Sequence, residues 1–341
     1  MAGLFEINQV AKREDLMDIL TRVDEKATPF VSMVSRGSTP KNTYMEWPVD
    51  AYGDPNVGTG VIDGSDVSTY ENAAEQRALL SSYLQTFRRT AKVSRLAQSV
   101  SDVAGVSDEI SNAISVKGVE LLRDMESAML SDQEHQVDTG SVAYLLRGLG
   151  VWLRDTTNLE APGAGSVGGQ SLHQVPAAFR ASVEPTATAS LTETNLQTLL
   201  QTLWTNTGMR GDYKLFCDAT LRRRFTDFTR TIATAGYSGR DFNFDGNSSR
   251  VSNTTTIFDG DFGTVEVIAD NFIGYSSSGA AQEAGRGYLV DMDKVDIRMH
   301  KNPTVERFED QGGGERFMIE ARGSLCVRNP LGMAQFSPAL T

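Results

Sequence analysis

Two short motifs in this chain have the residue types of ligand sites. Gly163, Gly165 and Gly168 match the spacing of the dinucleotide fingerprint, in which a helix N-terminus that follows a buried strand binds pyrophosphate. The preceding residues, Thr-Asn-Leu-Glu-Ala-Pro, predict no buried strand. The motif is therefore interpreted as a flexible loop rather than a cofactor site.

The second motif consists of alternating Asp and Asn residues. Asp241, Asn243 and Asp245, followed by Gly246, copy the first half of a calcium-binding loop, in which alternate oxygen ligands surround the ion. The twelfth position is Ser252 instead of the bidentate Glu, and no pair of helices flanks the motif. The sequence favours a surface turn, and it leaves open whether these three residues bind an ion.

Histidine and cysteine are sparse. His135, His173 and His300 lack the spacing of a metal site or a catalytic triad, and we interpret each as a surface or packing residue. Cys217 and Cys326 are too few and too far apart for a disulfide framework or a zinc site, so reduced thiols are expected. The usual hydrolase, zinc-protease and phosphate-loop motifs are absent from the sequence. We predict no catalytic residues, no cofactor, no metal, and a protein that is not an enzyme.

Composition argues against two further classes of protein. The formal net charge of −12 argues against binding of nucleic acid along the surface, because phosphate neutralisation requires clustered Lys and Arg. The basic runs Arg88-Arg89 and Arg222 to Arg224 are expected to form ion pairs within or between subunits. The sequence contains no secretory signal and no run of about 18 apolar residues, so we expect a soluble protein without a membrane segment.

The apolar periodicity predicts an α+β chain of about two domains. A long helix is expected from Ser107, its possible N-cap, to about Ser131. An edge strand at 43–49 and a half-buried strand at 82–94 frame a projecting loop that is rich in Gly and Asp. Residues 147–190 predict a boundary with little periodicity.

The remaining elements follow from the same patterns. They are a short helix near 176–183, a helix capped by Thr192 or Thr194, a strand at 213–217, a helix at 218–228, strands at 264–269 and 287–291, and a C-terminal hairpin with strands at 295–301, 304–309 and 316–328 around a Gly-rich turn.

The N-terminal segment has apolar anchors but no sustained period. Leu16, Ile19, Leu20 and Val23 line one short helical face, and Pro29 interrupts the chain before a core can form. Such an arm needs a surface that something else supplies. If another copy of the chain supplies it, the protein is a building block of an assembly.

Six motifs, in order along nearly the whole chain, carry a resemblance to a known family. They are Arg13-Glu-Asp-Leu, Thr28-Pro-Phe-Val-Ser, Tyr44-Met-Glu-Trp, Gln85-Thr-Phe-Arg-Arg-Thr-Ala-Lys-Val-Ser, Glu120-Leu-Leu-Arg-Asp-Met-Glu and Glu320-Ala-Arg-Gly-Ser-Leu-Cys-Val-Arg-Asn-Pro. Together they resemble the tailed-bacteriophage major capsid (major head) proteins with the HK97 fold.

The resemblance implies an α+β, HK97-like fold with four parts. These are an N-terminal arm (1–42), an extended loop (50–82), a peripheral domain with a long spine helix (43–49, 83–190 and 291–341) and an axial domain (191–290). Candidate contacts between subunits are Leu16, Ile19, Leu20, Phe30, Met33, Arg88 and Arg89. Deletion of residues 1–28 is expected to leave a folded subunit that assembles poorly.

The implied function is structural. Copies of the chain would assemble as pentamers and hexamers into the icosahedral head shell around a double-stranded DNA genome, without sequence-specific DNA binding. The implied partners are further copies of the chain, a separate scaffolding protein, a portal and, as an optional component, a decoration protein. The implied location is the virion, after synthesis and assembly in the bacterial cytoplasm. An encapsulin-like nanocompartment shell, which packages enzymes, is the alternative function.

Two departures from the family pattern narrow these expectations. Some relatives weld their shells through a loop Lys and a neighbour's Asn, but this chain has no Lys between Lys41 and Lys92. The shell is therefore expected to lack that covalent bond. The arm begins almost at Met1, which leaves no room for a fused scaffolding segment and is the reason for expecting a separate scaffolding protein.

Overall fold

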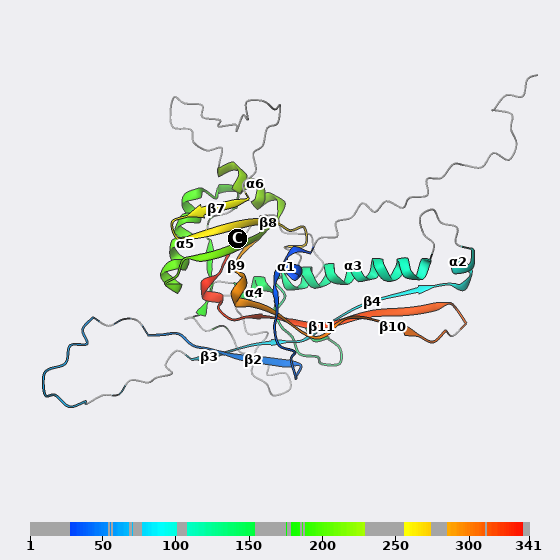
Figure 1. The fold of residues 1–341 in the computed structure, drawn as a ribbon, viewed down its shortest axis with the longest axis horizontal. Helices are drawn as coiled ribbons and strands as arrows, with labels where there is room; N and C mark the ends of the chain where they lie inside the picture. The colour runs from blue at the N-terminus through cyan, green and yellow to red at the C-terminus, as the bar shows by residue number, and fades with distance from the viewer. Residues whose placement is uncertain are drawn as a thin grey trace, which may run out of the picture.

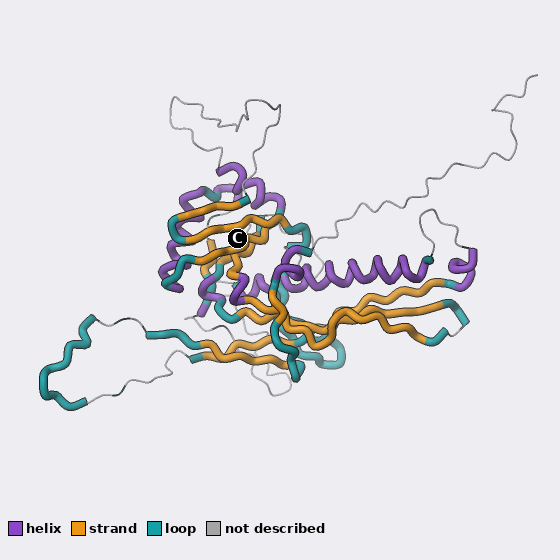
Figure 2. Tube along the Cα trace, viewed as in Figure 1, coloured by secondary structure: helices purple, strands orange, loops and turns teal. Residues whose placement is uncertain are grey.

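The structure is a computed structural model that describes most of the chain from Thr28 onward. The described ranges are 28–53, 57–67, 77–100, 108–153, 179–184, 188–228, 256–273, 285–310 and 312–336, with single positions between them. The described chain has a rounded part of helices and sheet, a long flat part with one straight helix, and a projecting loop (Figure 1). Figure 2 shows the same three parts by secondary structure.

The flat part is a four-stranded sheet with a long helix along one face (Figure 1). The strand order is β1-β10-β11-β4; β1 is parallel to β10, and the other pairs are antiparallel. The strands are β1 (Ser35–Arg36), β4 (Gln85–Val93), β10 (Val295–Phe308) and β11 (Glu315–Val327).

The turn of the β10–β11 hairpin confirms the predicted Gly-rich connection. Gly312 and Gly314 have φ angles of 89° and 110°, a backbone conformation that residues with side chains rarely adopt. The carboxylate of Asp310 accepts hydrogen bonds from both glycine N–H groups, at 2.8 and 3.2 Å. The hairpin register then pairs Phe308 with Arg316 next to the turn.

The long helix is α3 (Glu109–Met129), whose 21 residues extend about 32 Å at ~1.5 Å per residue. Its N-cap is Asp108, which accepts a hydrogen bond from the Ile110 N–H at 3.0 Å. Ser107, the predicted cap, lies outside the described residues. The apolar stripe packs on the sheet, and Leu121, Met125 and Met129 have no exposed surface.

A separate two-stranded ribbon carries the projecting loop. Strand β2 (Tyr44–Val49) pairs with β3 (Ala78–Tyr83) in antiparallel register, and the described loop residues 50–53 and 57–67 extend beyond the pair (Figure 2). The predicted strand at 82–94 is therefore divided in two. Leu84 separates β3 from β4 and donates its N–H to the Thr43 carbonyl at 2.9 Å.

The rounded part contains a six-stranded sheet of order β5-β12-β9-β6-β8-β7. The pairs β6–β8 and β5–β12 are parallel, and the others are antiparallel. The strands are β5 (Ser182–Glu184), β6 (Gly211–Cys217), β7 (Ile257–Gly260), β8 (Gly263–Ala269), β9 (Gly287–Asp291) and β12 (Ala334–Phe336).

Strands β5 and β12 differ from the predictions. The short helix predicted near 176–183 is wrong at its C-terminal end, because Val183 is extended and pairs with Gln335 of β12. Both strands hydrogen-bond within the six-stranded sheet, whereas the predicted division groups their residues with the four-stranded sheet. The cause is long-range pairing of three-residue strands, which local periodicity does not reveal.

Two helices, α5 (Glu193–Thr207) and α6 (Ala219–Phe228), pack against the six-stranded sheet. Thr192, one of the two predicted caps, forms a capping box with Asn195. Gly208 ends α5 in the left-handed conformation, at φ 69°.

The described residues form two hydrophobic cores. The first joins α3, the four-stranded sheet and the inner side of the six-stranded sheet, and the second joins α5 and α6 to its other side. Adjacent residues of β6 face different cores, because Leu215 belongs to the second and Phe216 to the first. No helix among the described residues is long and apolar enough to cross a membrane.

The remaining elements are short. They are α1 (Pro29–Met33), α2 (Arg95–Val100), α4 (Leu149–Trp152) and the 3₁₀ helices η4 (Thr188–Ser190), η5 (Met292–Lys294) and η6 (Pro330–Gly332).

Candidate functional site

The described end of the N-terminal arm is bound to its own subunit. The N–H groups of Phe30 and Val31, at the start of α1, donate to the Glu126 carboxyl group of α3 at 2.6 and 2.7 Å. These N–H groups have no acceptor within the helix, so the carboxyl group satisfies them. The expectation that the whole arm needs a surface from elsewhere is therefore wrong for this segment.

Packing and strand pairing also hold the arm end on its own subunit. Phe30 has no exposed surface and meets Phe216 edge-on, with ring centroids 5.2 Å apart. Strand β1 then pairs with β10, and the Ser35 hydroxyl donates to Asp296 at 2.6 Å. The arm end is thus part of the first hydrophobic core.

A second buried carboxyl group lies beside the anchor. Asp270 follows β8 directly, has 4% of its surface exposed, and accepts the Phe272 N–H at 2.8 Å. Burial and the adjacent Asp270 carboxyl group raise the pKa of Glu126 to about 9, and burial also raises the pKa of Asp270. The pair therefore retains a proton at neutral pH. Because Glu126 has no exposed surface, the pair serves as a structural anchor and not as a catalytic acid.

The candidate contact residues of the arm occupy different positions. Leu16, Ile19 and Leu20 lie outside the described residues. Phe30 is fully buried among side chains of its own chain, so it offers no surface to a neighbour. Met33, on the same short helix, has 45% of its surface exposed.

Arg88 and Arg89 form ion pairs within the subunit, on opposite faces of β4. Arg88 contacts Glu320 of β11 at 2.7 Å, and Arg89 contacts Asp124 of α3 at 2.5 Å. The hydrogen bonds that Arg89 donates to the Asp124 carboxylate raise the pKa of the guanidinium.

The second basic run differs from its predicted ion pairing. Arg222 donates to the backbone carbonyl of Val267, and Arg224 donates to that of Leu191 at 2.8 Å. The reason is that both side chains lie within reach of carbonyl groups that face α6, which local sequence does not show.

The projecting loop holds a group of exposed apolar side chains. Each has at least 70% of its surface exposed: Tyr52, Val57, Val61, Ile62, Val67 and Tyr70. Sequence reasoning located the loop but singled out none of these residues, because they follow no period. The available signal was apolar residues within a segment rich in Gly and Asp, where a core cannot form.

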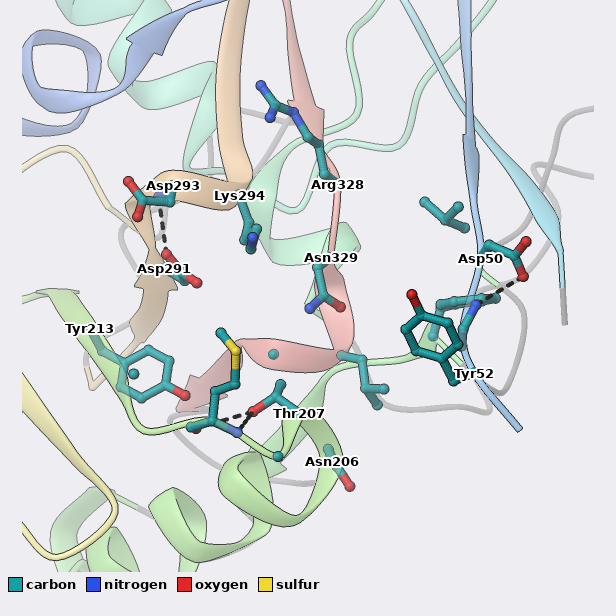
Figure 3. Close-up of a pocket in the computed structure, with 18 of the residues that line it drawn as sticks. Asp50, Tyr52, Asn206, Thr207, Tyr213, Asp291, Asp293, Lys294, Arg328 and Asn329 are labelled. Carbon is teal, nitrogen blue, oxygen red and sulfur yellow. Dashed lines mark hydrogen bonds between the residues drawn. The ribbon is translucent and has the colours of Figure 1, made fainter. Parts of the chain in front are cut away.

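A crevice of about 1080 Å³ lies between the loop base and the six-stranded sheet. Tyr52 lines it from the loop base, Thr207 and Tyr213 from the end of α5 and β6, and Asp291 from β9 (Figure 3). Asp291 accepts the N–H of Asp293 at 3.0 Å, and burial raises its pKa. The described lining residues include no Ser, Cys or His, so they supply no nucleophile and base pair of the usual kinds.

The other residues considered for chemistry are structural where they are described. His135 is fully buried and lies edge-on to Tyr83, with ring centroids 5.6 Å apart, whereas His300 is exposed on β10. Burial raises the pKa of Cys217 to about 12 and that of Cys326 to about 11, and both thiols are free.

Three sequence candidates fall outside the described residues. These are His173, the glycine motif at 163–168 and the carboxylate motif at 241–245. Within the described ranges, the structure contains no group of three or more potential metal ligands.

Comparisons with known proteins agree on one class of protein. A family model described as SU10 major capsid protein matches residues 4–338. A search of curated proteins found no match.

Solved capsid structures are similar over nearly the whole chain. The capsid of cyanophage A-1(L) has a TM-score of 0.59 at 12% identity and covers 99% of this chain and 100% of its own. That of cyanophage P-SCSP1u has a TM-score of 0.58 at 12% identity, covering 99% and 98%. A structure of Mycobacterium phage Che8 has a TM-score of 0.54 at 11% identity, covering 96% and 98%. At these identities the structures support a shared fold, which is the fold implied by the resemblance.

Proposed function

This chain belongs to the SU10 major capsid protein family, and from that premise we propose how its copies build the phage head shell. The protein is a structural, non-catalytic subunit of the shell. We propose that its copies associate as pentamers and hexamers, and that their arms and projecting loops lap over neighbouring subunits. Contacts that are weak individually become strong when every subunit repeats them.

The exposed apolar surface of the projecting loop carries this proposal. Tyr52, Val61 and Ile62 each have at least 80% of their surface exposed, although apolar burial is worth about 25 cal/mol per Å². Such a group of apolar side chains typically marks an interaction site. A neighbouring subunit that covers the loop gains this free energy without any rearrangement of the folded parts.

The division of the chain remains part of the proposal. We assign residues 1–42 to the arm, 50–82 to the extended loop, and 191–290 to the axial domain. The peripheral domain comprises 43–49, 83–190 and 291–341, with α3 as its spine. The second hydrophobic core, which joins α5 and α6 to the six-stranded sheet, supports a separate axial unit, whereas the first core includes residues of both sheets.

The partners beyond the chain itself are also proposals. We propose that the shell assembles in the bacterial cytoplasm with a separate scaffolding protein and a portal, and that a decoration protein is an optional addition. The net charge of −12 supports a wall that lies close to packaged double-stranded DNA without binding it tightly. The family match favours a phage shell over the encapsulin-like alternative.

Electron microscopy of the purified protein, alone and with co-expressed scaffolding protein, tests the proposal. We expect closed shells of uniform size when the scaffolding protein is present. Isolated monomers under all conditions would contradict the assembly function, and uniform shells from the chain alone would contradict the requirement for scaffolding. Particles from infected cells are expected to contain DNA, and an enzyme cargo would instead indicate a nanocompartment.

A further inference from the structure

The segment 270–273, which directly follows β8, connects the six-stranded sheet to the long helix. At its start, the Asp270 N–H donates to the Cys217 carbonyl at the end of β6, at 2.9 Å. Further along, the Phe272 carbonyl accepts the Ser127 hydroxyl of α3 at 3.4 Å. The arm end α1 lies in the same place, where the rounded part meets α3 (Figure 1). The segment therefore joins the two parts of the subunit beside the arm end.

Two carboxyl groups meet at this junction. Both oxygens of Glu126 accept backbone N–H groups of α1, at 2.6 and 2.7 Å. Asp270 accepts the Phe272 N–H through Oδ1, whereas no N–H group or hydroxyl of the described residues reaches its buried Oδ2. The two carboxyl groups hydrogen-bond to each other, and a bond between two acceptors of this kind requires a proton. We call this contact of Glu126 and Asp270 the carboxyl latch.

Without the shared proton, the carboxyl latch would hold two negative charges in contact. Glu126 is fully buried and Asp270 is 4% exposed, so water screens the repulsion only weakly. Glu126 is held in place by the N–H groups of α1, which bind a carboxylate at least as well as a neutral carboxyl group. The repulsion is therefore relieved by movement of Asp270 and its segment away from α3.

Other ionisable groups surround the carboxyl latch. They are Arg123 on α3, which lies over the Phe272 ring, Cys217 and Asp218 at the end of β6, and Arg222 on α6, which donates to the Val267 carbonyl; α1 contributes none. The arginines stay charged at all moderate pH values. Burial raises the pKa of Cys217 to about 12, so this thiol titrates well above the carboxyl latch.

We propose that the shared proton of the carboxyl latch fastens segment 270–273 to α3, and that loss of this proton lets the segment open locally. The proposal concerns the folded subunit and goes beyond the proposed function, because it does not depend on whether the subunits form shells. A short segment that opens by itself, while the rest of the subunit stays folded, is a common type of local unfolding. In a shell subunit, the open segment would join the rounded part to α3 less rigidly.

The direction of the pH effect depends on which state binds the proton. In the closed state, burial and Asp270 raise the pKa of Glu126 to about 9. In the open state water reaches both carboxyl groups, so their pKa values return to the ordinary range of about 4. The closed state therefore binds more protons in the window between these values, and opening becomes easier as pH rises through it, by up to about ten-fold per pH unit. Above about pH 9 the dependence levels off, because the closed state has then lost its proton as well.

Hydrogen exchange of the full chain tests the proposal. Mass spectrometry of a peptide that contains Asp270 and Phe272 measures the protection of their N–H groups, after division by the intrinsic exchange rate at each pH. We expect this protection to fall by up to about ten-fold per pH unit between about pH 6 and 9. Constant protection over this range would overturn the proposal.

Substitutions of Asp270 separate the shared proton from the contact itself. Asp270→Asn keeps the contact, because its amide donates to Glu126, but it has no shared proton to lose. Its protection is expected to be independent of pH. Asp270→Ala removes the contact and is expected to show low protection at every pH. A dependence on pH in Asp270→Asn equal to that of the unaltered chain would overturn the proposal.

Controls cover folding, charge and assembly. Asp261→Asn, at an exposed position just before β8, is the matched control and should retain the pH dependence of the unaltered chain. If circular dichroism shows that Asp270→Asn does not fold, Glu126→Gln takes its place, since it also lacks the shared proton and is expected to show no pH dependence. Shell formation is followed separately by sedimentation, so a failure of the proposed function leaves the exchange result intact.

A bound cation is the alternative to a proton between the two carboxyl groups. In that case protection at about pH 9 would rise with added sodium or potassium chloride and would not fall as pH rises. This result would overturn the carboxyl latch. With a shared proton, we expect protection to change less than about two-fold between the two salts and over this range of salt concentration, because the site is buried.

Discussion

The anchored arm end and the projecting loop both carry apolar residues, and they place them in opposite environments. Phe30 and Val31 have at most 3% of their surface exposed, and their N–H groups bind Glu126. Val61 and Ile62 of the loop have at least 80% exposed. Apolar side chains therefore belong to the core in the arm end and to the solvent-facing surface in the loop.

Backbone hydrogen bonding accounts for the difference. The arm end meets a buried carboxyl group and the edge of β10, which satisfy its N–H groups and permit burial. The loop is rich in Gly and Asp, which favour turns exposed to water over a packed element. We conclude that the arm end contributes to the folding of one subunit, whereas the loop is available for contacts between subunits.

The largest expected effect concerns assembly. Replacing Tyr52, Val61 and Ile62 by Ser removes apolar surface that only a neighbour would bury, so we expect shell formation to fall about ten-fold or more. The free energy of unfolding of the subunit is expected to change by less than about 0.5 kcal/mol. Sedimentation and urea unfolding measure the two quantities. Val142→Ser, at an exposed apolar residue outside the loop, is the control and should assemble normally.

Replacement of a buried residue of the arm end is expected to cause a large loss of stability. Phe30→Ala leaves a cavity against Phe216 and is expected to lower the free energy of unfolding by about 3–5 kcal/mol. Met33→Ala, on the same helix but partly exposed, is the matched control and should cost less than about 1 kcal/mol. Equal effects of the two substitutions in urea unfolding would show that the arm end is not anchored as described.

The anchor also predicts that the stability of the subunit depends on pH. In the unfolded chain Glu126 loses its proton near its ordinary pKa of 4.5, but in the folded subunit it does so near 9. The folded state therefore binds more protons between these values, and stability falls as pH rises through this window, by at most about 1.4 kcal/mol per pH unit. Glu126→Gln cannot ionise and is expected to flatten this slope in urea unfolding at several pH values. An unchanged slope in the variant would assign the dependence to other groups.

The smallest expected effect is an absence of covalent linkage at the loop. Because no Lys lies between Lys41 and Lys92, the loop contact is expected to be non-covalent. Denaturing electrophoresis of mature particles should show a single band near 37.1 kDa. A ladder of multimers would place a covalent bond at the contact.

Elements with a clear period were predictable from the sequence. The apolar stripe predicted α3, the alternation of Phe87 with Arg88 predicted β4, and the Gly-rich turn predicted the β10–β11 hairpin. Thr192 was predictable as a cap because its side chain and Asn195 act over three residues. In each case the deciding interactions are local.

The features that could not be predicted from the sequence depend on contacts between residues that are far apart in the chain. Glu126 lies 96 positions after Phe30, and within α3 it looks like an ordinary polar position. Leu84, which lies between β3 and β4, donates its N–H to Thr43, a residue far earlier in the sequence. Lys92 and Arg316 lie opposite each other only because of the β4–β11 register. The candidate surfaces therefore required the tertiary structure, although the residues that form them are visible in the sequence.

The two free cysteines divide between the two hydrophobic cores. Cys326 lies in the core that contains the arm anchor, and Cys217 lies in the core of α5 and α6. Both are fully buried, so each reacts with an alkylating reagent only when its own core opens. Mass spectrometry of the two labelled peptides over time would measure both opening rates in one molecule. The labelling rates of the two cysteines therefore report separately on the opening of the two hydrophobic cores.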